Sequence, residues 1–292
     1  MRRPRHVLLV IVAALASACA ATPRPPTPAD ENRIPLVVTP TGPDRRLADV
    51  DLLVDGTPAR FLLDTGAAVS SVANDAWAKR YPTLGPDTST GVSGRPEPCD
   101  VIQPNEIRLA SHRFAAPRIT RCDRNILGID LLGTVVFQVD LAARALRILP
   151  SFPRDGPRHP LRTLRRGHVT VPLALGDQRV WGLIDTGADT TVIDSAFVDR
   201  HPEAFTLART EPGTDAHGHA VESKVFRCRE VDVGPLKLND VEVAAFDFGD
   251  YLRSRMEGAP LIVGNDVIGH ARWTFDVAGG AWSATPTDES SR

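Results

Sequence analysis

The sequence lacks the motifs that mark several large classes of enzyme and nucleic-acid-binding protein. It has no Gly-x-Ser-x-Gly elbow, no glycine-rich phosphate loop and no His-Glu-x-x-His helix, so the corresponding hydrolase and phosphate-binding mechanisms have no support. The formal net charge is only −2, and no basic stripe with interleaved aromatic residues is present. A nucleic-acid partner is therefore not expected.

The apolar stretch near the N-terminus is too short to span a bilayer. The first 19 residues are instead typical of an export signal, because arginines precede an apolar core at residues 7–15 and small residues lead to Cys19. This ending resembles a bacterial lipobox, which implies acylation of Cys19. Cleavage near Ala20 and an uncleaved anchor are the alternatives. Because residue 20 is not aspartate, we expect an exported, periplasmic lipoprotein that its lipid anchors to the outer membrane.

Cysteine is scarce, with three residues after Cys19. In an oxidising compartment we favour a disulfide between Cys99 and Cys122, because the chain between them has the pattern of one hairpin. Cys228 is then a lone thiol. The alternative is that all three are small buried side chains without a bridge.

Helical periodicity is also scarce, and short β-rich runs separated by Gly, Pro, Asn and Asp follow one another from Leu36 onward. This pattern predicts a mostly β fold with a few short helices, expected at residues 72–80, 195–200 and 251–256. Residues 20–35 are rich in proline and have no periodic apolar pattern, so they should form an extended tether.

The chain repeats internally around two Asp-Thr-Gly-Ala segments. In the first copy the turn dipeptide Asp55-Gly56 precedes an apolar strand that runs into Asp64-Thr65-Gly66-Ala67. In the second copy Gly176-Asp177 precedes a strand that runs into Asp185-Thr186-Gly187-Ala188. Two such turns in matching contexts are a strong signal, whereas one would be weak.

Later landmarks of the repeat keep a constant spacing. The offset between the copies is 136 from Gly128 to Asp140 (264 − 128 and 276 − 140), but 121 at the aspartates (185 − 64). The second copy therefore has 15 additional residues (136 − 121), expected in its hairpin region or at residues 247–258. The predicted organisation is a signal peptide at 1–19, a tether at 20–35, a first lobe at 36–150, a linker at 151–166, a second lobe at 167–285 and a tail at 286–292.

An apolar strand that feeds an Asp-Thr-Gly turn has a physical logic. The buried strand presents the carboxylates of Asp64 and Asp185 from a rigid floor. Thr65 and Thr186 can each hydrogen-bond across to the other copy. Gly66 and Gly187 let the backbone pass close beneath the carboxylates.

Both copies resemble the retropepsin-like aspartic proteases over residues 36–285, on the two turns and on the segments Ile126-Leu127-Gly128 and Ile262-Val263-Gly264. The resemblance implies an acid-protease fold of two pseudo-symmetric closed β-barrel lobes. A chain with both copies is similar to a fused dimer, so we expect a monomer. The turns end in alanine where pepsin-like enzymes usually have serine, and this should raise the pKa of the carboxylate.

The resemblance implies an endopeptidase that acts on peptides or exposed protein segments without a metal or organic cofactor. Asp64 and Asp185 are the expected catalytic pair, which shares one proton and activates a water. The alternatives are a catalytically silent peptide-binding or scaffold protein of the same fold, and an enzyme whose lobes pair between two chains.

The family also closes β-hairpin flaps over its substrate. The candidates here contain Gly91 and Gly94 in the first copy, and Gly213 and Gly218 in the second. Ordinary glycine-rich surface turns are the alternative.

Several polar residues near these motifs have a structural and a functional interpretation. His217 and His219 with Asp215 could suggest a metal site, but we expect a solvated loop and no metal. Asp130 and Asp266 are expected to cap short helices. Asp189 has either a substrate-side role or a structural ion pair. The sequence alone does not decide between the structural and the functional interpretation of these residues.

Overall fold

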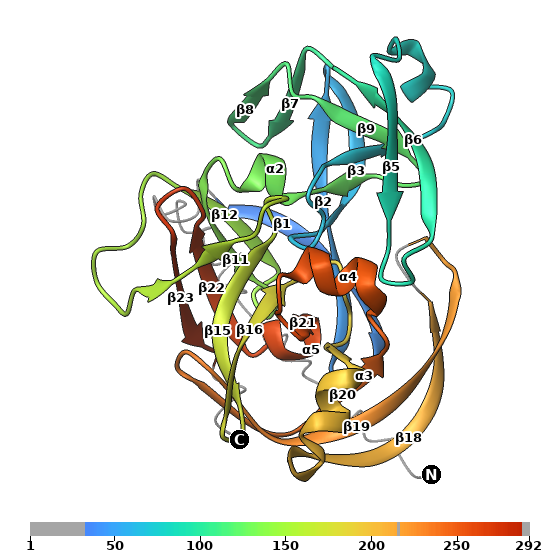
Figure 1. Ribbon diagram of the computed structural model, residues 1–292. Helices are drawn as coiled ribbons and strands as arrows, with labels where there is room; N and C mark the ends of the chain where they lie inside the picture. The colour runs from blue at the N-terminus through green and yellow to red at the C-terminus, as the bar shows by residue number, and fades with distance from the viewer. Residues whose placement is uncertain (1–32, 215–216, 288–292) are drawn as a thin grey trace, which may run out of the picture. The chain divides into compact units, whose positions relative to one another are not determined.

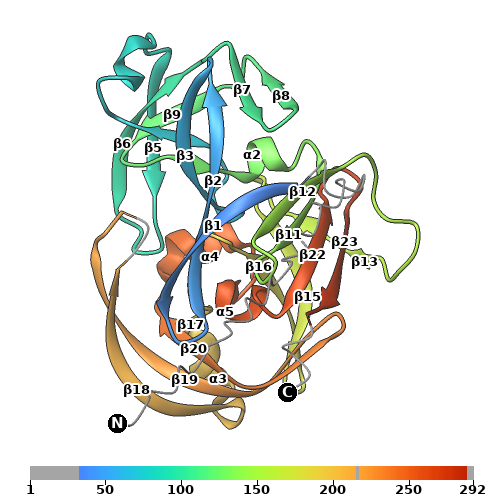
Figure 2. The same cartoon turned by 180° about the vertical axis from the view of Figure 1, so that it is seen from behind.

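The computed structural model describes residues 33–214 and 217–287 (Figures 1 and 2). Strands account for 54% and helices for 11%, which confirms the mostly β fold predicted from the sequence. No helix in these two stretches is long and apolar enough to cross a membrane. The signal peptide, Cys19 and most of the tether lie outside the described residues.

Nine strands surround the first Asp-Thr-Gly turn. They follow the order β2-β3-β10-β4-β9-β6-β5, and β7 pairs with both β2 and β8. Their bounds are β2 Arg45–Val54, β3 Thr57–Leu63, β4 Ser71–Ala73, β5 Gly85–Thr90, β6 Pro96–Ile102, β7 Glu106–Leu109, β8 His112–Ala115, β9 Ile119–Cys122 and β10 Ile126–Leu127. The end of β2 alternates exposed and buried side chains, so one face of the sheet enters the core.

A closed six-stranded barrel surrounds the second turn. The order is β15-β16-β21-β17-β20-β19, and the ring closes where Leu175 of β15 pairs with Val231 of β19. β14 and β18 extend this sheet at its edges. The bounds are β14 Arg162–Thr163, β15 Val169–Leu175, β16 Gln178–Ile184, β17 Val192–Asp194, β18 Phe205–Thr214, β19 Ala220–Val233, β20 Leu236–Phe246 and β21 Leu261–Val263.

A further set of strands draws on both ends of the described chain, in the order β13-β23-β22-β11-β12-β1. The bounds are β1 Arg33–Gly42, β11 Val136–Asp140, β12 Ala145–Leu149, β13 His159–Pro160, β22 Ala271–Asp276 and β23 Ala281–Pro286. At its centre β11 and β22 are antiparallel, so that Phe137 lies opposite Phe275 and Gln138 opposite Thr274. β1 also pairs with β2 and so joins this set of strands to the strands around the first turn.

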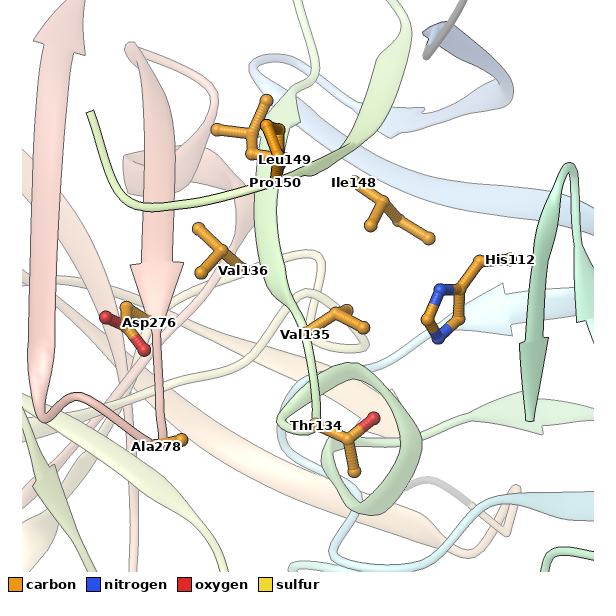
Figure 3. Close-up of a pocket in the computed structure, with 9 residues that line it drawn as sticks. All are labelled: His112, Thr134, Val135, Val136, Ile148, Leu149, Pro150, Asp276 and Ala278. Atoms are coloured by element: carbon orange, nitrogen blue, oxygen red, sulfur yellow. The ribbon is translucent and has the colours of Figure 1, made fainter. Parts of the chain in front are cut away.

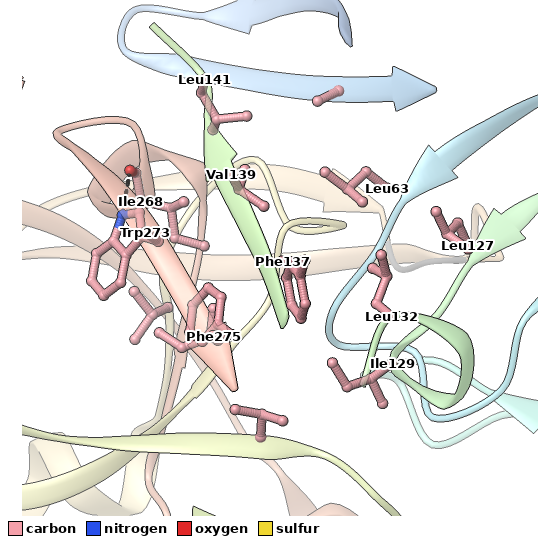
Figure 4. Close-up of a cluster of buried hydrophobic side chains, with 14 of the residues drawn as sticks. Leu63, Leu127, Ile129, Leu132, Phe137, Val139, Leu141, Ile268, Trp273 and Phe275 are labelled. Carbon is pink, nitrogen blue, oxygen red and sulfur yellow. Dashed lines mark hydrogen bonds between the residues drawn. The ribbon is translucent and has the colours of Figure 1, made fainter. Parts of the chain in front are cut away.

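Large aromatic side chains fill the core beside these strands (Figure 4). Trp273 and Trp282 are fully buried and stack with ring centroids 5.4 Å apart. The indole nitrogen of Trp273 donates to the carbonyl of Ile268 at 2.7 Å, so its polar atom is satisfied. Burying each such ring contributes on the order of 2–3 kcal/mol. Figure 4 places Leu63 and Leu127, which precede the first turn and its glycine segment, in this cluster.

The helices are short: α2 Ile129–Leu132, α3 Ser195–Arg200, α4 Gly249–Met256, α5 Asn265–Ile268 and the 3₁₀ turns Ala78–Arg80 and Pro202–Ala204. The predicted helix at 195–200 is confirmed, and the one at 251–256 lies within α4. The predicted helix at 72–80 is wrong for most of its length. Val72 instead belongs to β4, where it is buried between β9 and β10.

The predicted tether and linker are also too long. Residues 33–35 belong to β1, because the side chain of Ile34 is buried and pairs with Leu146 of β12. The linker at 151–166 contains β13 and β14, which pair with β23 and β15. A high content of proline and arginine therefore does not exclude strand pairing in these segments.

A disulfide joins Cys99 of β6 to Cys122 of β9, with the two Cα atoms 4.8 Å apart. This is the pair that the sequence favours. β6 and β9 are antiparallel neighbours, and the β7–β8 hairpin lies between them in the chain. Cys228 is a buried free thiol.

Candidate active site

The first Asp-Thr-Gly turn is held by the strand that ends before it and by the segment that runs beside that strand. β3 pairs in parallel with β10, and the amide of Asp64 donates to the carbonyl of Leu127 at 3.0 Å. The amide of Ala67 donates to Oδ1 of the aspartate at 2.8 Å. Leu63, just before the aspartate, is fully buried. The carboxylate is therefore presented from a rigid strand end.

The second turn is held in the same way. β16 pairs in parallel with β21, and the amide of Asp185 donates to the carbonyl of Val263 at 3.0 Å. The amide of Gly187 donates to Oδ1 of Asp185 at 2.9 Å. The same backbone contact thus fixes both aspartates.

The two threonines lock the turns together through four reciprocal hydrogen bonds. The hydroxyl of Thr65 donates to the carbonyl of Ile184 at 2.8 Å and accepts from the amide of Thr186 at 3.1 Å. The hydroxyl of Thr186 donates to the carbonyl of Leu63 at 2.8 Å and accepts from the amide of Thr65 at 3.0 Å. Both threonines are buried, so no water replaces these bonds.

Each aspartate lies against the glycine of the opposite turn. A Cβ on Gly66 would lie 2.3 Å from Cγ of Asp185, and a Cβ on Gly187 would lie 2.3 Å from Cγ of Asp64. No side chain fits at either glycine without displacing a carboxylate. Both glycines are therefore required by close approach, not by a left-handed backbone.

The two carboxyl groups hydrogen-bond to each other. Burial raises the pKa of Asp64, whose side chain is nearly closed off from solvent. Burial, and then the charge of Asp64, raise the pKa of Asp185 well above its usual value. Two carboxyls this close do not both ionise cheaply, so the pair holds one proton over a wide pH range. One oxygen can then accept a proton while another donates one.

Asp130 and Asp266 lie in the first turns of α2 and α5, whose N-cap residues are Gly128 and Gly264. They are therefore not N-cap residues, although Asp266 accepts from the amide of Val267 in the first turn of α5 at 2.9 Å. Asp130 accepts from the hydroxyl and the amide of Ser70 at 2.6 and 2.9 Å. Asp266 accepts from the hydroxyl and the amide of Thr191 at 2.6 and 2.9 Å. Each carboxylate therefore ties the chain just after an Asp-Thr-Gly turn to the start of a short helix.

The candidate flap glycines lie at or beside the tips of two hairpins. Gly91 and Gly94 are in the loop between β5 and β6, where Gly94 has a φ of 73°. Gly213 is near the end of β18, and Gly218 precedes β19 with a φ of 79°. Asp215 lies outside the described residues.

The two hairpins contact each other through the histidines. His217 lies 3.1 Å from the hydroxyl of Ser89 and 3.0 Å from a carboxylate oxygen of Asp123. His219 pairs with Glu97 at 3.0 Å. Within residues 33–214 and 217–287, no group of three or more His, Cys, Asp or Glu residues is placed to hold a metal ion.

Helix α4 lies beside the second turn, and nothing in the sequence predicts this contact. Leu252 of α4 packs against the same apolar cluster as Ala188, which ends the turn, and Val92, which lies in the loop between β5 and β6. Arg253 anchors the helix by two bonds to the carboxylate of Asp194, at 2.7 and 2.9 Å. α4 falls at residues 249–256, one of the two places expected for the additional residues of the second copy.

His168, which the sequence did not single out, faces the backbone of Gly66 from the start of β15. Burial, and then the charges of Arg255 and Arg166, lower the pKa of His168. The imidazole is therefore neutral near pH 7, while two guanidinium groups beside it remain charged. No motif marks His168 in the sequence. Only the apolar strand that follows it could have drawn attention to this residue.

Asp189 follows Ala188 directly and is half-buried. It takes part in no ion pair with the residues that the structure describes, so the structural ion pair expected as one alternative is not seen. A carboxylate without a cation therefore lies next to the second turn.

A cavity of about 560 Å³ lies away from the two turns (Figure 3). Its lining is His112, Thr134, Val135, Val136, Ile148, Leu149, Pro150, Asp276 and Ala278. Asp276 is engaged by Arg158 at 3.6 Å. The cavity contains neither catalytic candidate, and the paired carboxyls are the stronger candidate site.

Residues 171–267 match a family model described as aspartyl protease. The matched stretch begins in β15 and ends in α5, so it covers the closed barrel, the turn at Asp185 and the glycine segment beneath it. No curated protein gives a significant match to the chain.

Proposed function

We propose that the protein is an aspartic endopeptidase in which Asp64 and Asp185 form the catalytic pair. The observation that carries the proposal is the arrangement of these two carboxyls, which are hydrogen-bonded to each other and held by matching backbone contacts. Asp64 is buried and Asp185 is half-buried. The family match over residues 171–267 supports peptidase chemistry for the half that contains Asp185.

The mechanism is general acid and base hydrolysis without a covalent intermediate. The ionised carboxyl takes a proton from a water that attacks the peptide carbonyl, and the protonated carboxyl donates to the carbonyl oxygen. Fixed turns hold the two groups ready for this exchange, because Thr65 and Thr186 join them through buried hydrogen bonds. The cycle needs no metal or organic cofactor.

We also propose that the chain is a tandem of two pseudo-symmetric lobes and acts as a monomer. Gln138 and Thr274, which differ by the repeat offset of 136, pair directly in the centre of β11 and β22 (274 − 138). The side-chain amide of Gln138 donates to the hydroxyl of Thr274 at 3.0 Å. This register is what a two-fold axis between the copies requires. Both aspartates then come from one chain.

Export and lipid anchoring through Cys19 remain part of the proposal. The disulfide between Cys99 and Cys122 supports an oxidising compartment. A catalytically silent peptide-binding protein of the same fold is the second candidate. It is less well supported, because binding alone does not call for two adjacent carboxyls that share a proton.

Replacement of each aspartate tests the proposed activity. Asp64→Asn and Asp185→Asn should each abolish cleavage of a peptide library, since an amide neither accepts nor supplies the proton. Asp177→Asn, an exposed turn residue before β16, is the matched control and should keep full activity. If the wild-type protein shows no pepstatin-sensitive cleavage between about pH 3 and about pH 8, where the pair gains and loses its shared proton, the silent-binder alternative replaces the enzyme.

A further inference from the structure

A positively charged residue, Arg124, lies near Asp64, the first of the paired carboxyls. Arg124 precedes β10, and its carbonyl accepts from the hydroxyl of Ser71 at 2.8 Å. The carbonyl of Asn125, the next residue, accepts from the amide of Leu62 at 3.0 Å. These bonds fix the backbone of Arg124 beside β3, the strand that delivers Asp64. The charge of Arg124 acts on Asp64 and opposes the effect of burial on its pKa.

Arg124 is available to a ligand. Its side chain is 41% exposed, and its carboxylate neighbour Asp123 lies 3.7 Å away. Asp123 is closer to His217, at 3.0 Å. Because its ion pair with Asp123 is long and its side chain is partly desolvated, the guanidinium group of Arg124 can exchange this contact for a better-aligned carboxylate.

Two more cations, Arg166 and Arg255, lie near the first turn, where they flank His168, whose side chain faces the carbonyl of Gly66. Arg255 is on helix α4 and donates to the hydroxyl of Tyr251. Neither arginine forms an ion pair within the described part of the chain, and burial lowers the pKa of Arg255, an effect to which the charge of Arg166 adds. Like charges held together without a carboxylate favour an anion that comes from outside.

The second turn has no counterpart of Arg124 or of His168. By the offsets of the repeat, Pro260 stands where Arg124 does (260 − 124 is 136), and Leu47 stands where His168 does (168 − 47 is 121). The carboxylate of Asp189 lies beside this turn. The hydrogen-bonded floor is matched between the copies, but the charge around it is not.

We infer that the protein binds an acidic residue of the substrate peptide on the Asp64 side of the paired carboxyls, with Arg124 as its specificity-determining residue. The inference rests on the proposed peptidase function. A Glu or Asp carboxylate would form a charge-assisted, two-pronged contact with the guanidinium group of Arg124, and Arg166 and Arg255 would add long-range attraction. Hydrogen bonds between charged groups correspond to a preference of about 10- to 100-fold over the neutral isostere.

Paired peptides test the inference through turnover. Peptides found to be cleaved are resynthesised with Glu or Gln at each position beside the cleaved bond, and kcat/KM is measured for each. Wild type should favour Glu at one position on one side by about 10-fold or more. Arg124→Ala should remove the preference, Arg124→Lys should keep part of it, and Arg124→Glu should reverse it towards Lys. Arg113→Ala, which truncates an exposed arginine of β8, should change nothing.

A second measurement separates this inference from the proposed function. The same peptides with a reduced, uncleavable bond are titrated against wild type and Arg124→Ala, and binding is followed by fluorescence anisotropy. Binding that favours Glu only when Arg124 is present supports the inference even if no peptide is cleaved. Equal affinity for Glu and Gln, a preference that survives Arg124→Ala, or no binding overturns it, whether or not the protein is an enzyme.

Discussion

Removal of one threonine hydroxyl beneath the paired carboxyls should destabilise the whole fold. Thr65→Val keeps the shape of the side chain but deletes its hydroxyl. The amide of Thr186 then loses its acceptor at 3.1 Å, and the carbonyl of Ile184 loses its donor at 2.8 Å. Both groups are buried where water cannot replace the hydroxyl, because Thr65 is 2% and Thr186 0% exposed.

The size of the loss follows from these two orphaned groups. A buried backbone group without a partner costs about 1–3 kcal/mol, so we expect Thr65→Val to lower the free energy of unfolding by about 4 kcal/mol. A small domain has only about 5–15 kcal/mol in all. Thr186→Val orphans a different amide and a different carbonyl and should cost a similar amount. The double variant should lose less free energy of unfolding than the two single variants together, because the first substitution already separates the turns.

Urea unfolding measures the effect, with fluorescence from the buried Trp273 and Trp282 as the reporter. Thr65→Ser keeps the hydroxyl and is the matched control, with an expected loss of about 1 kcal/mol for the missing methyl. If Thr65→Val costs no more than Thr65→Ser, the backbone groups have found other partners. In that case Thr65 and Thr186 do not hold the two turns together, and the prediction is refuted.

Two further predictions concern stability. The pKa of Asp266 is raised by burial from 3.8 to about 6, so the folded state holds its proton more tightly, and stability should fall by about 3 kcal/mol as the pH rises from about 4 to about 6. Urea titrations at several pH values should show a fall in wild type that is larger by about 3 kcal/mol than the fall in Asp266→Asn, in which other carboxyls with raised pKa values, such as Asp64, still titrate, and equal slopes would contradict it. Replacing both Cys99 and Cys122 by alanine opens a loop with a sequence separation of 23 and should cost about 3 kcal/mol. An unchanged melting curve under reducing and oxidising conditions would contradict that.

The two Asp-Thr-Gly turns could be predicted from the sequence because short-range rules determine them. An apolar strand must be buried, and a following Asp-Thr-Gly then leaves its carboxylate at the end of that strand. The contacts of Asp64 with Leu127 and of Asp185 with Val263 join segments that the repeat had already marked. The mostly β composition followed from the same alternation of apolar runs and turn residues.

The surroundings of the site could not be predicted in this way. The sequence predicts a helix that begins at Val72, but pairing with β9 and β10 places this residue in a strand. The proline-rich composition around Ile34 predicts a tether, yet pairing with β12 makes this stretch the start of β1. His168 gave no local signal at all, since its meaning depends on contact with Gly66, about a hundred residues earlier.

The residues that the sequence predicts and those that it does not predict also have different functions within the site. Residues that the repeat duplicates, such as Thr65 and Thr186, hold the two carboxyls in matching positions, and a reaction that exchanges one proton between them requires that match. Residues that the repeat does not duplicate, Arg124 and helix α4, lie around this floor on one side or the other. A peptide has a direction, so a symmetric floor alone would accept it either way round. The unduplicated residues are therefore where the protein can set which substrate binds and in which orientation.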